Sequence, residues 1–528
     1  MVHEQATAQR NAPPAAVAPD GPAERLSLLR LGVLILVIAA LAGGGYLGIR
    51  KVTAPGEPAA QSWGVPYVDV TLTPTYQFQD PRSNPSRNIA LAFVVGDRTD
   101  GCAPSWGAAY TLDQAATQLE LDRRIAQLRA VGGDVMISFG GLANSELAVS
   151  CADVDRLTQA YRSVISRYEV NVIDLDIEST ALTDQTSVLR RAKALAALQQ
   201  QRRAGGHDLA IWLTLPVAPT GLTDAGQQVV LTMLREGVSL RGVNVMTMDY
   251  GTFGSRPDML AVARQALQAT AGQLAGLYAR AGIRLDQVQR WARLGVTPMI
   301  GQNDIDNEVF TLDDARGLAD FARRQGLGRV SLWSINRDAP CGATFPSVAV
   351  HSNTCSGVPQ APLAFTQVYA TLPGRAPDAP ASDAIVMPTQ QPDADDPRTS
   401  PYPVWRPSAQ YPEKYRVVWH GLVYQAKWFT QGNDPSALLG TGTPNPWALL
   451  GPVESHDAAP KPVPTVTGVR TLWATNSLYN KGDRVLFGGL PYQARWLTKG
   501  DSPSTEFPVG NDSPWQPLFT IPGEPVTP

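Results

Sequence analysis

The sequence predicts an α/β protein: a (β/α)8 TIM barrel followed by two small β modules, with an N-terminal transmembrane helix before the barrel. Three observations lead to this fold class. Short apolar runs alternate with amphipathic stretches over residues 63–372. An aromatic-rich pattern occurs twice near the C-terminus, and one apolar run near the N-terminus is long enough to cross a bilayer.

Composition argues against a protein that binds polyanions. The 528 residues carry a formal net charge of -3 and contain no basic tract, so we expect no nucleic-acid partner and an uncharged ligand instead. The length exceeds that of one ordinary hydrophobic core, and several domains are therefore expected.

An uninterrupted apolar run extends from Leu31 to Ile49, with basic residues on both sides. About 20 apolar residues span the hydrocarbon core of a bilayer. The sequence therefore predicts a cytoplasmic tail at 1–30, a transmembrane anchor at 31–51 and a short linker at 52–62. A cleaved signal peptide is the alternative, although its apolar region is normally shorter and closer to the N-terminus.

All four cysteines follow this run, in none of the spacings typical of a zinc site, and no metal site is predicted. An even number of cysteines beyond a membrane anchor is typical of disulfides in an oxidising compartment. We pair Cys102 with Cys151, because each follows a predicted strand, and Cys341 with Cys355, which close a short loop. Two other connectivities, and free buried thiols, remain alternatives.

Eight short apolar runs predict the barrel strands, at 66–72, 89–95, 134–139, 170–177, 209–215, 242–248, 294–299 and 330–335. Amphipathic segments predict helices between most of them, at 113–130, 153–168, 185–203, 257–281 and 312–324. Alternating strands and helices predict a parallel sheet, and eight such units predict a closed barrel. Active sites in this fold lie at the C-terminal ends of the strands.

The fourth strand is the most informative segment. Side chains of a strand alternate between its faces, so Asp174, Asp176 and Glu178 share one face while Ile and Leu residues occupy the other. Burial and like charge both raise the pKa of such carboxyls, and a carboxyl that stays protonated near neutral pH is a general acid. The alternative is the solvated face of an exposed strand. Glu178, at the end of the strand, is the predicted catalytic acid.

Four strands together resemble the family 18 glycoside hydrolases. Their fourth-strand pattern D-G-x-D-x-D-x-E is matched at Asp174, Asp176 and Glu178, although Asn171 and Val172 replace Asp-Gly. The third strand has Ser138-Phe139-Gly140-Gly141, like S-x-G-G, the sixth has Met246-Thr247-Met248-Asp249-Tyr250, like M-x-Y-D, and Trp333 lies near the end of the eighth. Met248 occupies the usual tyrosine position. Tyr250, on the same face if the strand stays extended, is predicted to supply the hydroxyl.

The resemblance implies hydrolysis with retention, in which the 2-acetamido group of the substrate is the nucleophile. Glu178 would protonate the leaving oxygen and then activate water, Asp176 would hold the acetamido N–H, and Asp174 would share a proton with Asp176. Asp249 and Tyr250 would orient the acetamido group and the water. Further substrate contacts are expected from Trp333, Met246, Ser138 and Gly140.

Deep-cleft members of this family often carry a small α+β insertion after strand seven. Here strand seven is predicted to end near Ile300 and a helix resumes by Asp313, which leaves no room for that insertion. The sequence therefore predicts an open cleft and an endo-acting enzyme.

Beyond the barrel, residues 373–402 are rich in Pro, Ala and Asp and predict an extended linker. Two modules follow, at 403–453 and 469–522, joined by a linker at 454–468. Their aromatic and turn residues recur at an offset of 68 positions, for example Tyr424-Gln425-Ala426 and Tyr492-Gln493-Ala494. So small a unit cannot bury so many aromatics, and some should be exposed.

The repeats resemble family 5 and 12 carbohydrate-binding modules, which bind chitin or cellulose. Sugar rings stack on exposed aromatic faces, and the predicted binding residues are Trp428, Trp447, Trp496 and Trp515. The first copy has Lys414-Tyr415 where the second has Gly482-Asp483, which predicts a weaker or differently folded first module.

The sequence as a whole predicts a membrane-anchored chitinase with an extracytoplasmic catalytic domain. It is expected to act as a monomer on chitin or another N-acetylglucosamine polymer, with no cofactor. An endo-β-N-acetylglucosaminidase acting on N-glycans and a non-catalytic chitin-binding lectin or adhesin are the alternatives. The intact Glu178 argues against the lectin.

Overall fold

The computed structural model describes residues 63–251, 253–342, 351–372, 385–386, 395, 400–437, 444–454, 457, 462–503 and 513–520. The predicted tail, anchor and first linker at 1–62 lie outside these residues, as does most of the predicted linker at 373–402. Within the described part of the chain, no helix is long and apolar enough to cross a membrane.

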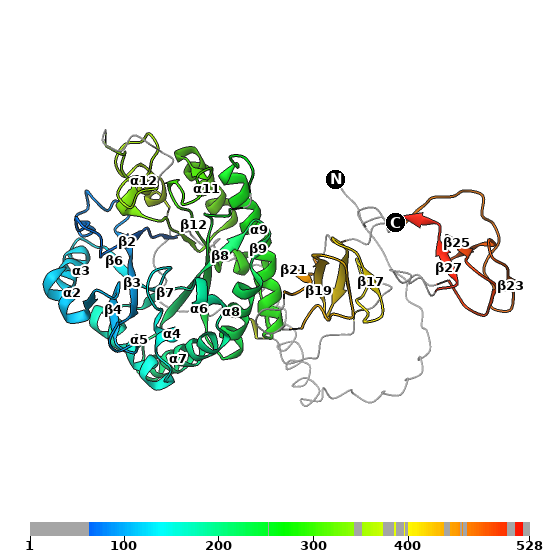
Figure 1. The fold of residues 1–528 in the computed structure, drawn as a ribbon, viewed down its shortest axis with the longest axis horizontal. Coiled ribbons are helices and arrows are strands. Elements are labelled where there is room, and N and C mark those ends of the chain that lie inside the picture. Colours follow the sequence, from blue (N-terminus) through cyan, green and yellow to red (C-terminus); the bar gives the residue numbers. More distant parts are fainter. Residues whose placement is uncertain are drawn as a thin grey trace, which may run out of the picture. The chain divides into compact units, whose positions relative to one another are not determined.

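A large sheet forms the centre of the α/β domain (Figure 1). Its parallel strands follow the order β1-β15-β12-β10-β8-β7-β6-β3. The bounds of these strands are Trp63–Gly64 (β1), Asn88–Gly96 (β3), Asp134–Gly140 (β6), Val172–Asp176 (β7), Ala210–Ala218 (β8), Leu240–Met246 (β10), Leu294–Thr297 (β12) and Arg329–Val330 (β15). Each overlaps or adjoins a segment that alternation predicts, except β1, which precedes the first of them.

Residues 63–69 connect the two ends of this strand order. β1 pairs with β15, and β2 (Tyr67–Asp69) pairs with β3 on the other side. Between them, the Val65 N–H donates to the carbonyl of Val330 at 3.0 Å and the Ala90 N–H donates to the carbonyl of Pro66 at 2.8 Å. The segment predicted as the first strand therefore pairs with β15 before Pro66 and with β3 after it. The change of partner falls at Pro66, which has no N–H to donate.

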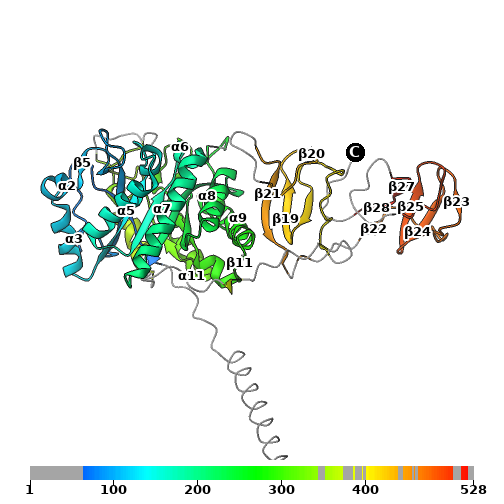
Figure 2. The same ribbon diagram turned by 90° about the horizontal axis from the view of Figure 1, so that it is seen from below.

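Helices cover the outside of the sheet, and α5, α7, α8 and α9 lie side by side there (Figures 1 and 2). Asp and Thr side chains accept hydrogen bonds from the first turns of many helices, as Asp153 does from the Arg156 N–H, which sets where these helices begin. The bounds are Leu112–Gln118 (α2), Leu121–Ala130 (α3), Leu147–Ser150 (α4), Val154–Tyr168 (α5), Ser179–Thr183 (α6), Gln185–Ala204 (α7), Asp224–Arg235 (α8), Met259–Arg280 (α9), Gln287–Ala292 (α10), Leu312–Gln325 (α11) and Ala364–Ala370 (α12). The segment 113–130, predicted as one helix, forms two, because Glu120 adopts a left-handed conformation between them.

Seven further described strands of two or three residues lie outside the parallel order of the α/β domain. They are Pro104–Trp106 (β4), Tyr110–Thr111 (β5), Gly221–Leu222 (β9), Ile283–Arg284 (β11), Gly301–Gln302 (β13), Val309–Phe310 (β14) and Ile385–Val386 (β16). Between β12 and α11, the described structure has only the β13–β14 hairpin, consistent with the absence of an insertion there. The eighth predicted strand is shorter than expected. β15 ends at Val330, Trp333 forms an isolated parallel bridge with Met299, and a 3-10 turn (Ile335–Arg337) follows.

Both predicted disulfides are confirmed. Cys102 is bonded to Cys151 and Cys341 to Cys355, and no described cysteine is free. The first bond joins the loop after β3 to the end of α4, at the same edge of the sheet as the acidic strand ends.

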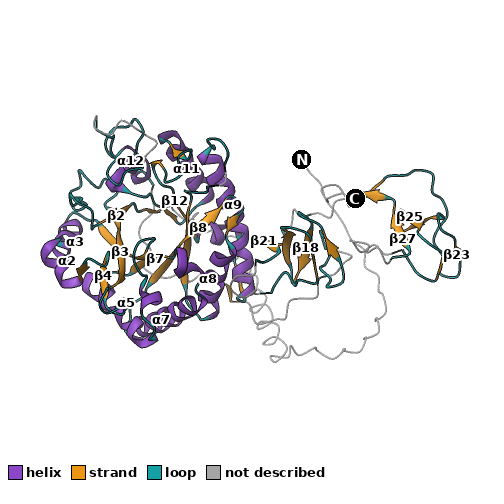
Figure 3. Cartoon of the chain, in the orientation of Figure 1, coloured by secondary structure: helices purple, strands orange, loops and turns teal. Residues whose placement is uncertain are grey.

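The two C-terminal repeats have matching strands (Figure 3). Each has a three-stranded antiparallel sheet, β18-β19-β21 or β24-β25-β27, and a two-stranded pair, β17-β20 or β23-β26. The first copy comprises Gln410–Tyr411 (β17), Arg416–Trp419 (β18), Leu422–Ala426 (β19), Thr430–Gln431 (β20) and Trp447–Pro452 (β21). The second comprises Leu478–Tyr479 (β23), Arg484–Phe487 (β24), Leu490–Ala494 (β25), Thr498–Lys499 (β26) and Trp515–Pro517 (β27), with a further pair of Val463–Pro464 (β22) and Phe519–Thr520 (β28).

Lys414 gives the first copy the same turn as the second, so the prediction of a different fold is wrong. Lys414 has φ +68° and Gly482 has φ +96°. The Lys414 N–H donates to the Ala426 carbonyl at 2.7 Å, as the Gly482 N–H does to the Ala494 carbonyl at 2.8 Å. This hydrogen bond, present in both copies, holds Lys414 in a left-handed conformation. That conformation costs a non-glycine residue roughly 1–2 kcal/mol.

Trp447 and Trp515 are core residues of the repeats, so the prediction that they bind sugar is wrong. They are 1% and 0% exposed, and their indole N–H groups donate to the carbonyls of Asn433 and Asp501, each at 2.8 Å. The two indole rings therefore pack in the cores of the modules, beside other buried aromatic residues such as Tyr424 and Tyr492. Trp428 and Trp496 are 43% exposed each, and the neighbouring Phe429 and Leu497 are 61% and 60% exposed.

Candidate active site

The row of acids lies at the C-terminal end of β7, between β6 and β8. Asp174 and Asp176 are buried members of the strand, and Glu178 follows it as the residue before α6. Glu178 makes no side-chain hydrogen bond to the start of that helix. Its carboxyl is therefore not used as a helix cap.

Asp174 accepts hydrogen bonds on both carboxylate oxygens. Oδ1 accepts from Arg329 Nη1 at 2.6 Å and from Thr214 Oγ1 at 2.7 Å. Oδ2 accepts from Tyr67 Oη at 2.8 Å and from Ser138 Oγ at 2.7 Å. Ser138 is fully buried, so it holds this carboxylate, and the prediction that it contacts substrate is wrong.

Asp176 lies above Asp174 on the same face of β7. Burial, then the negative charges of Glu178 and Asp174, raise its pKa well above the usual value, and Arg329 opposes this shift. Its Oδ1 is buried and has no hydrogen-bond partner among the described residues. A buried polar atom without a partner is costly and often marks a ligand position. Asp176 is therefore placed to hold a donor group of a ligand.

Gly140 ends β6, the strand that pairs with β7 next to the acids. It has φ +100°, and a Cβ atom there would lie 2.1 Å from the Asp176 carbonyl oxygen. The glycine lets β6 approach β7 next to the acids, and its predicted substrate contact stays a prediction.

Glu178 is poised to exchange a proton near neutral pH. Burial is the main cause, and the charges of Asp249 and Asp304 add to it, so that the pKa of Glu178 rises to about 7. A carboxyl with this pKa is protonated in a substantial fraction of molecules at neutral pH, as a general acid must be.

If Glu178 acts as a general acid, Asp304→Asn is expected to shift the alkaline limb of the pH–rate profile to lower pH. Asp304 raises the pKa of Glu178 and of Asp249, so removing its charge lowers the pKa of Glu178 and the acid loses its proton earlier as pH rises. The backbone N–H of residue 304, which donates to Asp249 Oδ1 at 2.8 Å, is kept. The measurement is kcat/KM against pH. Asp306→Asn, at an exposed neighbouring acid, is the control and should leave the alkaline limb in place; an unshifted limb in Asp304→Asn contradicts the electrostatic role.

The sixth-strand motif is not an extended strand throughout. β10 ends at Met246, and Asp249 has φ +49°, so the argument that placed Tyr250 by strand alternation is wrong. The carboxylate of Glu308, which is fully buried, instead accepts from the backbone N–H groups of Tyr250 at 3.0 Å and Gly251 at 2.8 Å. Glu308 thus holds the turn that carries Asp249 and Tyr250 at the strand end.

Tyr250 still reaches a position suited to a ligand contact. Its hydroxyl is buried and has no hydrogen-bond partner in the described residues. Burial, with the charge of Glu308, raises its pKa, so the hydroxyl stays protonated and able to donate. Asp249, whose pKa burial and Asp304 raise to about 6, lies next to it in the sequence.

Three aromatic side chains lie together near the strand ends. Trp333 stacks on Phe93 with ring centroids 5.4 Å apart and planes inclined by 21°, and it meets the edge of Tyr67 at 6.0 Å. Trp333 and Phe93 are only partly buried, so the pair presents aromatic surface. Met246, at the end of β10, is 9% exposed, and its substrate contact stays a prediction.

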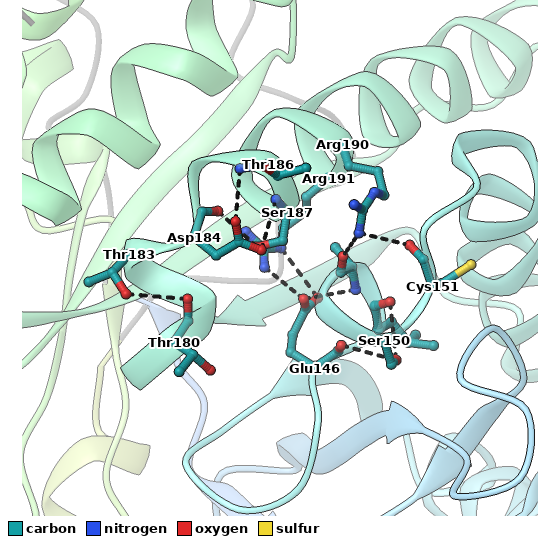
Figure 4. A network of polar contacts seen from close by, with 12 residues as sticks. Glu146, Ser150, Cys151, Thr180, Thr183, Asp184, Thr186, Ser187, Arg190 and Arg191 are labelled. Atoms are coloured by element: carbon teal, nitrogen blue, oxygen red, sulfur yellow. Dashed lines mark hydrogen bonds and ion pairs between the residues drawn. The ribbon is translucent and has the colours of Figure 1, made fainter. Parts of the chain in front are cut away.

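A buried ion pair supports the loop after β6. Arg191 of α7 bonds to Glu146 at 2.6 Å, and Tyr161 of α5 donates to the same carboxylate at 3.1 Å. Figure 4 shows Arg190 and Arg191 reaching from α7 to the α4 segment, where Arg190 donates to the Cys151 carbonyl at 3.1 Å. The first disulfide is thereby attached to the helix that follows α6 and the acids.

Alternation could have found one residue that the sequence analysis missed. Arg329, Ser331 and Trp333 are separated by two positions each, and a strand would place the arginine on the face already assigned to Trp333. Tyr67, Phe93 and Glu308 carry no comparable signal. Among the described residues, no group of three or more His, Cys, Asp or Glu side chains is arranged to hold a metal ion.

Comparison with known proteins gives several relatives. The chain is 40% identical over 331 residues to the "Probable bifunctional chitinase/lysozyme" of Escherichia coli (strain K12), a match that covers 61% of this chain and 36% of that protein. It is 40% identical over 306 residues to "Endochitinase 11" of Metarhizium anisopliae, covering 56% of each. The chain thus spans well under two thirds of the length of both curated relatives.

The chain is also similar to a solved chitinase domain, over 59% of its length. A structure of active domain 2 of the thermostable chitinase from Pyrococcus furiosus, in catalytic-site mutants complexed with chito-oligosaccharides, matches with a TM-score of 0.51 and 28% identity, over 59% of this chain and 94% of that one. A scan against models of protein families matches none.

Proposed function

We propose that this chain is a chitinase, a glycoside hydrolase that cleaves β-1,4-N-acetylglucosamine linkages with retention. The observation that carries the proposal is the acid row itself: a proton-bearing Glu178 beside an Asp176 whose Oδ1 has no partner among the described residues. The similarity to two curated proteins and a solved structure that bear the name chitinase or endochitinase supports the same reaction.

The row favours a mechanism in which the substrate supplies the nucleophile. Two carboxyls must flank the bond when the enzyme supplies both groups. Acids spaced two residues apart on one strand cannot do this. The acetamido oxygen of the substrate would attack the anomeric carbon while Glu178 protonates the leaving oxygen, and Glu178 would later take a proton from the incoming water.

Asp176 and its neighbours would stabilise the intermediate. The unpartnered Oδ1 of Asp176 would accept the acetamido N–H, and its charge would offset the developing positive charge on the ring that forms. The Tyr250 hydroxyl, also without a partner in the described part, would donate to the acetamido oxygen or to the water. Trp333 would stack against the sugar.

The proposal includes a closed (β/α)8 barrel. The pairing of β1 with β15 and of β2 with β3 supports closure through residues 63–69. The short β13–β14 hairpin supports an open cleft and endo-acting cleavage, because little chain is available to wall the site.

We further propose the domain organisation and location that the sequence predicts. The anchor at 31–51 would hold the catalytic domain outside the cytoplasm, where the two disulfides are stable. The repeats at 403–453 and 469–522 would bind chitin through the exposed pairs Trp428–Phe429 and Trp496–Leu497.

Product analysis tests the reaction. Colloidal chitin incubated with the full chain should release soluble N-acetylglucosamine oligomers of mixed length, and an N-glycoprotein should be left intact. Release of whole glycans from the glycoprotein, with chitin untouched, would favour an endo-β-N-acetylglucosaminidase. Binding to chitin without any product would favour a lectin.

Trp428→Ala and Trp496→Ala together are expected to reduce adsorption to insoluble chitin and its hydrolysis, while the turnover of soluble oligomers stays close to that of the parent protein. Removing both rings takes away aromatic contact surface. By analogy with the roughly 1–3 kcal/mol that aromatic stacking contributes per nucleic-acid base, the double variant should bind at least about tenfold less tightly. Leu472→Ala, at another exposed apolar residue, is the control. Equal losses on soluble and insoluble substrate would assign the tryptophans to stability instead.

A further inference from the structure

The first repeat packs against helix α9 through glycines. Gly272 of α9 and Gly451 of β21 face each other: a Cβ atom at Gly272 would lie 2.3 Å from the Leu450 carbonyl oxygen, and one at Gly451 would lie 2.9 Å from the Gly272 carbonyl oxygen. One turn farther along α9, a Cβ atom at Gly276 would lie 3.0 Å from the Leu449 side chain. Glycine weakens the interior of a helix, so these two helix positions fit the close approach of β21 and not the stability of α9 itself.

Polar contacts join the same repeat to three helices of the α/β domain. They are Lys427 Nζ to Asp224 Oδ1 of α8 at 2.7 Å, Arg280 Nη2 of α9 to the Ser436 carbonyl at 2.8 Å, and Arg290 Nη1 of α10 to Glu454 Oε1 at 2.7 Å. Ion pairs near a surface contribute little on their own. The main contribution therefore comes from the apolar contact that they accompany, where Leu449 is 3% exposed.

The buried apolar residues of the first repeat are continuous with the core of the α/β domain. A single cluster of buried side chains includes Leu277 of α9 together with Tyr424 and Leu449 of the repeat. Among the described residues, Tyr492, the equivalent of Tyr424 in the second repeat, belongs to a separate cluster. The first repeat thus shares a core with the domain, whereas the second has a core of its own.

The second repeat has different residues at the positions that make this contact. At the offset of 68 positions, Phe519 replaces Gly451 and Pro517 replaces Leu449. Phe519 is 7% exposed and packs against Tyr492, with ring centroids 5.4 Å apart. A side chain of this size prevents the close backbone approach that Gly451 allows. The sequence therefore distinguishes a copy that docks on a helix from a copy that completes its own core.

The contact at Lys427 also determines where the exposed pair Trp428–Phe429 lies. Asp224 begins α8, directly after β9, and β9 pairs with the C-terminal end of β8. β7 and β8 are parallel neighbours, so the acid row lies at this same end of the sheet. Lys427 is attached there, and the two aromatic residues follow it directly in the chain.

We propose that the first repeat is a fixed part of the catalytic domain, seated on α9 through Gly272 and Gly451, and that Trp428 and Phe429 extend the binding surface for the polymer that the acid row cleaves. The ligand of this surface rests on the proposed function, whereas the docked position of the repeat does not. A polymer chain that leaves the active site would meet a surface already in place, without the entropy cost of ordering a tethered module. The second repeat would act as the tethered binder.

Distances between spin labels test the docked position without any substrate. Nitroxides on Gln265→Cys of α9 and Gln431→Cys of the first repeat, both at exposed positions, should give a narrow distance distribution by electron paramagnetic resonance in the full chain. The matched pair of Gln265→Cys with Lys499→Cys, at the equivalent position of the second repeat, should give a broad one. A distribution for the first pair as broad as that for the second would overturn the proposal.

Gly272→Leu tests the contact itself. Leucine favours a helix, but its side chain at this position would meet the β21 backbone, so the distribution for the first label pair should become broad while the α/β domain stays folded. Ala261→Leu, at an exposed position of the same helix, is the control and should leave the distribution narrow. A narrow distribution in Gly272→Leu would contradict the role of the glycines, and the label pair in the otherwise unaltered chain decides the matter if this variant does not fold.

Kinetics test the extended binding surface. Trp428→Ala should lower kcat/KM for a long soluble polymer such as glycol chitin by roughly fivefold or more, by analogy with the loss of one stacking contact to a nucleic-acid base. Trp496→Ala, the equivalent change in the second repeat, should lower it by a smaller factor. Equal effects of the two changes would overturn the assignment of this surface to the catalytic domain. Failure of the parent protein to cleave the polymer would instead remove the proposed function and leave the docked position to the spin-label measurement.

Discussion

Replacing Glu178 with Gln is expected to lower the turnover of a soluble chito-oligosaccharide by roughly 100- to 10,000-fold, the usual contribution of general acid–base catalysis. The side chain keeps its shape but cannot give a proton to the leaving oxygen. Because burial and two like charges raise the pKa of Glu178 to about 7, the loss of its charge should not destabilise the fold. Initial rates and thermal unfolding of the full chain provide the measurement.

The matched control for this variant is Glu236→Gln. Glu236 is a half-buried acid at the end of α8, away from the strand ends that carry the acid row, and its amide should leave the rate unchanged. A Glu178→Gln protein with a rate within about tenfold of the parent, well short of the expected loss, would remove Glu178 as the catalytic acid.

Asp176→Asn should give the second large loss, about 100- to 1,000-fold in kcat, comparable to the removal of one preorganised electrostatic group. The amide cannot offset positive charge in the intermediate. It also presents a donor, or a weaker acceptor, where the buried and unpartnered Oδ1 now lies. The measurement is kcat with an N-acetylated oligosaccharide, and Asp113→Asn, at an exposed acid of α2, is the control.

Substrate chemistry provides an independent check on Asp176. If it holds an acetamido N–H, fully deacetylated chitosan should not be cleaved by the parent protein. Ready cleavage of deacetylated chitosan, or an Asp176→Asn variant as fast as the parent, would exclude participation of the acetamido group.

The periodicity of the chain predicted the strands and helices of the α/β domain well. Alternation reports which face a strand residue occupies, and this was enough to predict that Asp174, Asp176 and Glu178 share one face. The disulfide pairs were predicted separately, from two cysteines that each follow a predicted strand and from two that close a short loop. It failed where the backbone leaves the regular state. Asp249 is left-handed, and Tyr250 is placed by a hydrogen-bonded loop and not by strand geometry.

Partners that lie far apart in the sequence could not be predicted in the same way. Glu308 reaches Tyr250 across 58 positions and Arg329 reaches Asp174 across 155, and neither pairing has a local signal. In the repeats, aromatic content indicated that some rings are exposed but not which ones. Trp447 and Trp515 can be buried because their indole N–H groups donate to backbone carbonyls inside the module. These contacts depend on the folded backbone, so the sequence pattern does not reveal them.

The duplicated modules also affect how the chain refolds after denaturation. In each copy an alanine of the central strand pairs with the tryptophan of the third strand, Ala426 with Trp447 and Ala494 with Trp515. The central strand of either copy therefore offers a similar pairing partner to the third strand of the other. Misassembly between similar units is a common failure of repeated domains. We expect a protein with both copies to give a lower yield of correctly paired molecules on dilution from denaturant than a protein with either copy alone.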